Sequence, residues 1–138
     1  MNNVAIIAAV GRSGQIGMNG VLPWYDGEDL RWFRHVTMGQ VLIVGSKTLE
    51  LLPPLPGRAV FGWGREIDPG QMVASLVEKN PDKMIFIAGG ARTYQAFLPF
   101  VRTCHITRVD YDGPADTFMP PIWRQTDCGT PGRFQAVS

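Results

Sequence analysis

Asp29 is a carboxylate on the apolar side of a predicted helix, where an acid can bind a ligand and tune its protonation. Residues 28–38 are predicted to form a helix, and the side that carries Asp29 also carries three apolar residues: Trp32, Phe33 and Val36. The basic residues fall on the opposite side: Arg31, Arg34 and His35. A buried carboxylate needs a cation or hydrogen-bond donors, which the paired N–H groups of a pterin or pyrimidine edge would supply. The alternative is an acid that only favours the positive end of the helix dipole.

Two other segments share one arrangement, a predicted strand that ends in glycine and leads into a helix. They are "VLIVGSKTLE", residues 41–50, and "IFIAGGARTYQAF", residues 85–97. Hydroxyls, cations and free N–H groups at a helix start can hold phosphate, and glycine lets a ligand approach the backbone. The candidate residues are Gly45, Ser46, Lys47, Thr48, Gly89, Gly90, Arg92 and Thr93. Each junction alone is equally explained by packing and matches neither GxGxxG nor a P-loop, but the pair favours a dinucleotide.

Two arginines lie close to the next predicted strand, residues 58–63. Arg58 follows the stiff turn Pro53-Pro54-Leu55-Pro56-Gly57, so it is either a fork for a carboxylate or a solvated residue at a strand end. Arg65 leaves the same strand and meets either a phosphate or water.

The elements that position these residues alternate between strands and helices. Strands are expected at 4–10, 40–44, 58–63, 84–88 and 103–111, and helices at 28–38, 46–52, 71–80 and 90–100. This alternation predicts an α/β fold, with a central, mostly parallel, twisted sheet flanked by about four helices. The tail, residues 123–138, is expected to add a hairpin as an antiparallel edge, and residues 11–27 a long functional loop. A single domain, residues 1–138, is expected.

Composition excludes several classes of protein. The net charge is +1 and no basic run occurs, so nothing indicates nucleic acid as a partner. No segment approaches the length of a membrane span, and no signal peptide is evident. Cys104 and Cys128 are far apart, which argues against a disulfide scaffold or a metal site and predicts a reduced, cytoplasmic protein.

Together these segments resemble the dihydrofolate reductase family. The matching residues follow the family order from about Val4 to Pro120: Ile7-Ala8-Ala9, Ile16-Gly17-Met18, Leu22-Pro23-Trp24, Asp29-Leu30, Trp32-Phe33, Val44-Gly45, Lys47-Thr48, Leu55-Pro56-Gly57-Arg58, Gly89-Gly90, Tyr94, Phe97-Leu98-Pro99, Thr107 and Asp116-Thr117. The resemblance implies a dihydrofolate reductase-like fold and the NADPH-dependent reduction of 7,8-dihydrofolate to tetrahydrofolate. The expected partners are dihydrofolate and antifolate inhibitors, and a monomer is expected.

By this resemblance, each candidate residue receives a role. Asp29, with Thr107 behind it, binds the pterin and favours protonation of N5, while hydride passes to C6. Catalytic residues are expected to be Asp29, Leu22, Trp24 and Tyr94, and the substrate is expected to contact Ile7, Phe33, Leu52, Leu55, Arg58 and Thr107. Ala9, Ile16 and Tyr94 are expected near the nicotinamide, and Arg65 joins the two glycine junctions around the phosphates. A cis peptide is expected between Gly89 and Gly90.

The chain also departs from the family pattern. Ser46 stands where a basic residue is frequent, and Trp63-Gly64 stands where serine or threonine is usual, so the 2′-phosphate is expected to rest on Lys47 and Arg65. The family's extra strand between Arg65 and Lys83 is expected to be absent. Two alternatives remain: a riboflavin-synthesis reductase of the same fold, and a folate- or nucleotide-binding homologue with little catalysis.

Overall fold

The computed structural model describes residues 3–17 and 27–119, with only the backbone described for Gly17 and residues 27–30. Leu22, Trp24 and the tail hairpin predicted at 123–138 therefore lie outside the described residues. Asp29 lies in a described helix, but its side chain is not described, so its orientation stays a prediction.

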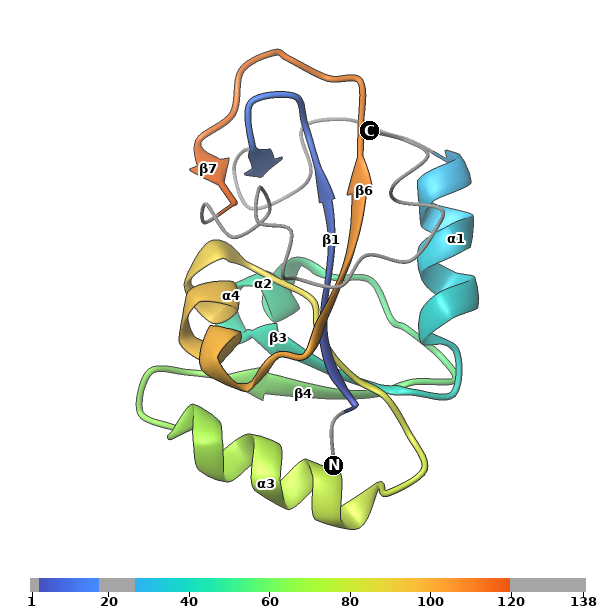
Figure 1. The fold of residues 1–138 in the computed structure, drawn as a ribbon. Coiled ribbons are helices and arrows are strands. Elements are labelled where there is room, and N and C mark those ends of the chain that lie inside the picture. The colour runs from blue at the N-terminus through green and yellow to red at the C-terminus, as the bar shows by residue number, and fades with distance from the viewer. Residues whose placement is uncertain (1–2, 18–26, 120–138) are drawn as a thin grey trace.

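The core of the fold is a sheet of five strands in which every pair is parallel (Figure 1). The strand order is β4-β3-β5-β1-β6. The strands are β1 (Val4–Val10), β3 (Val41–Gly45), β4 (Ala59–Trp63), β5 (Ile85–Ile87) and β6 (Thr103–Arg108). The predicted parallel α/β fold is confirmed, and β6 ends three residues before the predicted boundary, residue 111.

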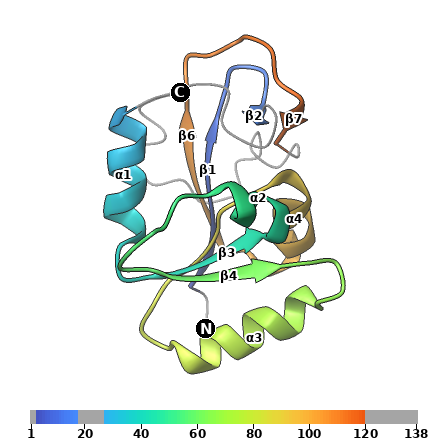
Figure 2. The ribbon, with the colours of Figure 1, turned by 180° about the vertical axis from the view of Figure 1, so that it is seen from behind.

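Helices cover both faces of this sheet, and α1 and α4 lie on opposite sides of β1 in two opposed views (Figures 1 and 2). The four helices are α1 (Gly27–Thr37), α2 (Ser46–Leu51), α3 (Pro69–Lys79) and α4 (Ala91–Phe97). A 3₁₀ turn, Leu98–Phe100, follows α4, because Pro99 cannot continue an α-helix. Four helices flank the sheet among the described residues, as expected.

Strand alternation divides the core into two clusters of buried side chains. Val4 and Ile6 of β1 face α3 and α4, and pack with Val73 and Phe97. Ala5 and Ile7 face the other way and pack with side chains from α1 and α2. Because both faces are covered, β1 reads as a continuous apolar run.

The orientation of α1 agrees with the helical period. Its apolar residues pack against the cluster around Ile7: Trp32, Phe33 and Val36. Its basic residues are exposed: Arg31, Arg34 and His35. The predicted orientation of α1 is therefore confirmed for Trp32, Phe33 and Val36.

A second, two-stranded sheet was not predicted: β2 (Gln15–Gly17) lies within the loop predicted at 11–27, and β7 (Thr117–Phe118) lies where no element was assigned. β2 pairs antiparallel with β7. Strands of three and two residues are too short to show an alternating pattern, which is why the sequence did not indicate them. Between residues 65 and 83, all described, only α3 occurs, so the expected loss of a strand is confirmed and β4 is an edge of the sheet.

Cys104 corrects one expectation from composition. It is fully buried in β6 and takes part in a disulfide, so the prediction of reduced cysteines is wrong for this residue. Its partner lies outside the described residues. No helix in the described ranges is long and apolar enough to cross a membrane.

Candidate cofactor and substrate site

The two strand–glycine–helix junctions touch one another. β3 and β5 are neighbours in the sheet, and their paired residues include Ile43 with Ile87, so the two glycine junctions that follow these residues lie side by side. Just beyond, the N–H of Gly45 donates to the carbonyl oxygen of Gly89 at 2.8 Å. The expectation that the junctions form one site is therefore supported by direct contact across 44 residues of sequence.

Each junction places a threonine hydroxyl against a glycine of the other. A Cβ on Gly45 would lie 2.5 Å from Oγ1 of Thr93, and a Cβ on Gly90 would lie 3.3 Å from Oγ1 of Thr48. The peptide between Gly89 and Gly90 is cis, as expected, and Gly89 has a φ of 123°, which favours glycine. The result is a surface of bare backbone and two hydroxyls, which fits phosphate oxygens.

Positive charge surrounds this surface at the mouth of the site. Ser46, Lys47 and Arg92 are exposed beside the two glycine junctions. Arg65 is also exposed, in a turn that the hydrogen bond from the Ile67 N–H to the Gly64 carbonyl closes at 2.9 Å. Exposed cations beside bare glycine backbone and threonine hydroxyls form a donor set that suits a dinucleotide phosphate.

Tyr94 connects α4 to β1, a strand of the interior of the sheet. Its phenol donates a hydrogen bond to the carbonyl oxygen of Ile7 at 2.9 Å, and burial raises the pKa of the Tyr94 phenol. A Cβ on Gly89 would lie 3.7 Å from the same phenol oxygen. Tyr94 therefore links the cofactor junction to β1, where Ala9 is half-buried two residues further on.

The face of the sheet beneath α1 collects the candidate substrate residues. Ile7 and Phe33 belong to one buried cluster, together with Leu55, whereas Leu52 is exposed at the margin. Thr107 is buried and pairs with Ala9 across the β1–β6 ladder, so both lie on the face that α1 covers. Ile16 packs against the opposite cluster, from β2. Ile7, Phe33 and Leu55 thus lie on the face of the sheet that α1 covers, and Ile16 lies on the other face.

Arg58 is held in place by its own turn and by α1. Its Nε and Nη2 donate to the carbonyl oxygen of Pro56 at 3.2 and 3.0 Å, and its Nη1 donates to Oγ1 of Thr37 at 3.3 Å. Partial burial, and then the nearby Arg34, lower the pKa of Arg58, so the site concentrates positive charge. A fixed guanidinium fork beside a second cation suits a carboxylate.

Thr37 was not identified from the sequence. It is fully buried, and its hydroxyl donates to the carbonyl oxygen of Phe33 at 2.8 Å while it accepts from Arg58. A threonine at the end of a helix carries no motif, and the 21 residues between it and Arg58 hide the pairing. The only sign of its role is that it is a buried polar residue close to Arg58, and this is visible in the structure but not in the sequence.

An open parallel sheet with glycine junctions at the carboxyl ends of two adjacent strands defines the class of α/β proteins that bind nucleotides at that edge. The sequence profile of one family, described as dihydrofolate reductase, matches residues 3–129. The chain belongs to the dihydrofolate reductase family.

Curated relatives agree with this family. The dihydrofolate reductase of Mycobacterium tuberculosis is 33% identical over 145 aligned positions, covering 98% of this chain and 90% of the relative. That of Neisseria gonorrhoeae is 34% identical over 142, covering 92% and 87%. A dihydromethanopterin reductase of Methylorubrum extorquens is 33% identical over 131, covering 89% and 94%.

Family membership makes the chain an enzyme, an oxidoreductase of the dihydrofolate reductase type that uses a nicotinamide cofactor. Neither alternative is favoured: the curated relatives are named as reductases of dihydropterins, not as binding proteins or as riboflavin-synthesis enzymes.

Proposed function

We propose that this protein catalyses the reduction of 7,8-dihydrofolate to 5,6,7,8-tetrahydrofolate with NADPH. The observation that carries the proposal is the contact between the two junctions, where the Gly45 N–H meets the Gly89 carbonyl at 2.8 Å and two threonine hydroxyls face bare glycine backbone. The family match gives this site its chemistry.

The cofactor is assigned to the edge of the sheet formed by these junctions. When bound, NADPH supplies the hydride that reduces C6 of the pterin. The glycine junctions and the hydroxyls of Thr48 and Thr93 hold its phosphates, Lys47 and Arg65 hold the 2′-phosphate, and the nicotinamide lies by Ala9, Ile16 and Tyr94. The remaining contacts come from Ser46, Gly90 and Arg92.

The substrate is assigned to the face beneath α1. Asp29 accepts hydrogen bonds from the pterin edge and, as a negative charge beside it, favours protonation of N5 by solvent. Thr107 supports Asp29, and Ile7 and Phe33 pack on the ring. Leu52 and Leu55 flank the aminobenzoyl group, and Arg58 binds the glutamate carboxylate. Leu22 and Trp24 complete the site by excluding water from the nicotinamide.

Dihydromethanopterin is a second candidate substrate, because one relative of nearly full coverage is a dihydromethanopterin reductase. Both substrates present a dihydropterin to Asp29, so the acid does not discriminate between them. The part of the substrate beyond the pterin does discriminate between them. Arg58 is oriented by Pro56 and Thr37 and is suited to a carboxylate, which dihydrofolate supplies through the glutamate attached to its aminobenzoyl group. This fork favours dihydrofolate.

One spectrophotometric experiment tests the proposal. The purified full chain is mixed with NADPH and either dihydrofolate or dihydromethanopterin, and the loss of NADPH absorbance is followed; NADH replaces NADPH in a parallel pair. Turnover with dihydrofolate at the higher kcat/KM supports the proposal, and turnover only with dihydromethanopterin contradicts it. Size-exclusion chromatography tests the expected monomer, and a cytoplasmic location is part of the same proposal.

A further inference from the structure

Gln15 is a buried amide that the proposed chemistry does not use. Its side chain is in β2 and only 3% exposed. Its Oε1 accepts from the Ser13 N–H at 2.8 Å, and its Nε2 donates to Oδ1 of Asp112 and to the carbonyl oxygen of Gly113, both at 3.1 Å. Both ends of the amide are thus used, and the contacts join segments 97 residues apart.

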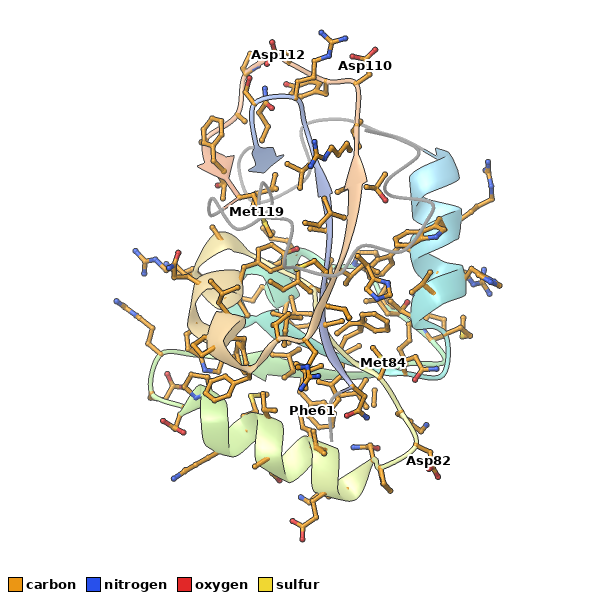
Figure 3. All side chains as sticks on the ribbon, viewed as in Figure 1. Phe61, Asp82, Met84, Asp110, Asp112 and Met119 are labelled. Atoms are coloured by element: carbon orange, nitrogen blue, oxygen red, sulfur yellow. The ribbon has the colours of Figure 1, made fainter. Side chains whose placement is uncertain are left out.

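Asp112 accepts a second hydrogen bond from the segment that precedes β2. The hydroxyl of Ser13 donates to Oδ1 of Asp112 at 2.7 Å, and the Arg12 N–H donates to the Tyr111 carbonyl oxygen at 2.8 Å. Asp112 lies at the connection that follows β6, next to Asp110 (Figure 3). Side chain and backbone therefore tie the chain before β2 to the chain after β6.

Gly11 shows that the backbone is shaped around this amide. A Cβ at Gly11 would lie 2.5 Å from Oε1 of Gln15 and 2.9 Å from the carbonyl oxygen of Tyr111. Neither atom lies at the end of a freely moving chain, since Oε1 is held by the Ser13 N–H. Only glycine permits this approach, so the backbone at Gly11 is compatible with the observed position of the Gln15 amide.

The element held in this way is short. β2 has three residues, and its ladder with β7 is irregular between Gln15 and Gly17. Successive residues of a strand point to opposite faces, so a slip of one residue would turn Ile16 out of the core and Gln15 into it. A ladder of this length cannot fix its own register, and the Gln15–Asp112 contact supplies the missing constraint.

We propose that Gln15 is a positioning residue for hydride transfer, which holds Ile16 against the nicotinamide by binding Asp112 and Gly113. The inference rests on the proposed function, because that function places the nicotinamide beside Ile16. Gln15 itself touches neither cofactor nor substrate. Its loss should therefore weaken cofactor binding while leaving pterin binding nearly unchanged.

A matched control lies two residues away. Asp110 forms an ion pair with Arg12 at 2.6 Å, but the two side chains are 83% and 65% exposed. Exposed ion pairs contribute little. Asp110→Asn and Asp112→Asn thus make the same chemical change on one loop, and only the second replaces the charged acceptor of the Gln15 amide by the weaker, neutral oxygen of an amide.

The experiment compares Gln15→Met, Asp112→Asn and Asp110→Asn with the wild-type chain. Fluorescence titration gives the dissociation constants for NADPH and for methotrexate, and hydrogen exchange of the cofactor-free protein reports on residues 11–17. Gln15→Met should raise the NADPH constant about tenfold, the size expected when one or two partly buried hydrogen bonds are lost. Asp112→Asn should raise it about threefold, because the asparagine oxygen still accepts but carries no charge. Both should speed exchange, and the methotrexate constant should change less than about twofold. Asp110→Asn should match the wild type.

A further variant distinguishes loss of the Gln15–Asp112 contact from a general loss of stability. Gln15→Glu sets a carboxylate against Asp112 and should bind NADPH worst; adding Asp112→Asn restores a donor–acceptor pair and should recover part of the affinity. Unchanged NADPH binding in Gln15→Met and Asp112→Asn, equal effects in Asp110→Asn, or no recovery in the double variant would overturn the inference. If the wild-type chain does not bind NADPH, the proposed function itself fails, and hydrogen exchange still reports whether Gln15 holds β2.

Discussion

The phenol of Tyr94 donates a hydrogen bond to the carbonyl oxygen of Ile7 at 2.9 Å, joining α4 to β1, 87 residues earlier in the chain. Because burial raises the pKa of this phenol, it remains a donor throughout the physiological range. The bond spans the boundary between the proposed cofactor side and substrate side.

Tyr94→Phe should lower the free energy of unfolding by about 1 kcal/mol, since a buried carbonyl loses its partner. Urea denaturation measures this change. The control is Tyr111→Phe, which removes a hydrogen bond to Pro114 at an exposed site and should cost less. A larger loss for Tyr111→Phe than for Tyr94→Phe would contradict the role assigned to burial.

Gly45→Ala should weaken NADPH binding at least about tenfold and destabilise the fold by about 1–3 kcal/mol. The new Cβ would stand 2.5 Å from Oγ1 of Thr93, so the two junctions must separate. Gly62→Ala is the control, because its Cβ would meet only the end of the Leu49 side chain at 3.0 Å. NADPH titration of both variants checks the expectation, and tight binding by Gly45→Ala would refute it.

Asp29→Asn should reduce kcat at neutral pH by about 100-fold or more, in the range typical of lost acid–base assistance, and leave the circular dichroism spectrum unchanged. Lower pH should recover part of the rate, because solvent then protonates the substrate without help. Glu28→Gln, in the same turn, is the control and should retain full activity. Near-normal turnover by Asp29→Asn would show that the carboxylate of Asp29 is not required for the reaction.

Arg58→Leu should weaken binding of methotrexate, which carries a glutamate tail, much more than binding of NADPH. The expected loss is about 10- to 100-fold, from one charge-assisted interaction. An antifolate without a carboxylate should bind both proteins alike, which isolates the fork from general damage. Thr37→Val, which removes the hydroxyl that accepts from Arg58 at 3.3 Å, should give a smaller loss in the same direction. Equal losses for both antifolates would disprove the carboxylate assignment.

His105 should make stability depend on pH. Its ring meets Phe86 edge to face, with centroids 5.3 Å apart, and burial lowers the pKa of His105 from 6.5. The unfolded chain therefore binds a proton before the folded chain does, and stability falls as the pH drops below about 6.5. Thermal unfolding between pH 7.5 and 5.5 should show a shallower slope for His105→Gln than for the wild type. His35→Gln, at an exposed position on α1, is the control.

Long periodic segments allowed most of the fold to be predicted. The apolar side of α1 follows from the spacing of Trp32, Phe33 and Val36, and the continuous apolar run of β1 follows from burial on both faces. The glycine junctions were recognised because strand, glycine and helix are adjacent in sequence. Local sequence patterns therefore predicted α1, β1 and the two glycine junctions.

Contacts between distant residues could not be predicted in this way. β2 and β7 have three and two residues, too few for a period. Thr37 meets Arg58, and Gln15 meets Asp112, only because the fold brings separate loops together. The disulfide at Cys104 likewise depends on tertiary proximity, which spacing in the sequence does not report.

The strand order has a consequence for how the protein assembles during synthesis. β1 pairs with β5 and β6, and β3 pairs with β4 and β5, so β5 alone joins the two halves of the sheet. A nascent chain that ends before residue 85 holds β1, β3 and β4 without the strand that unites them. Gly89 and Thr93 follow that strand, so the pairing of β5 that joins the two halves also brings together the two glycine junctions of the proposed cofactor site, before β6 is added. Binding of the proposed cofactor, NADPH, is therefore expected only once β5 has joined the two halves of the sheet.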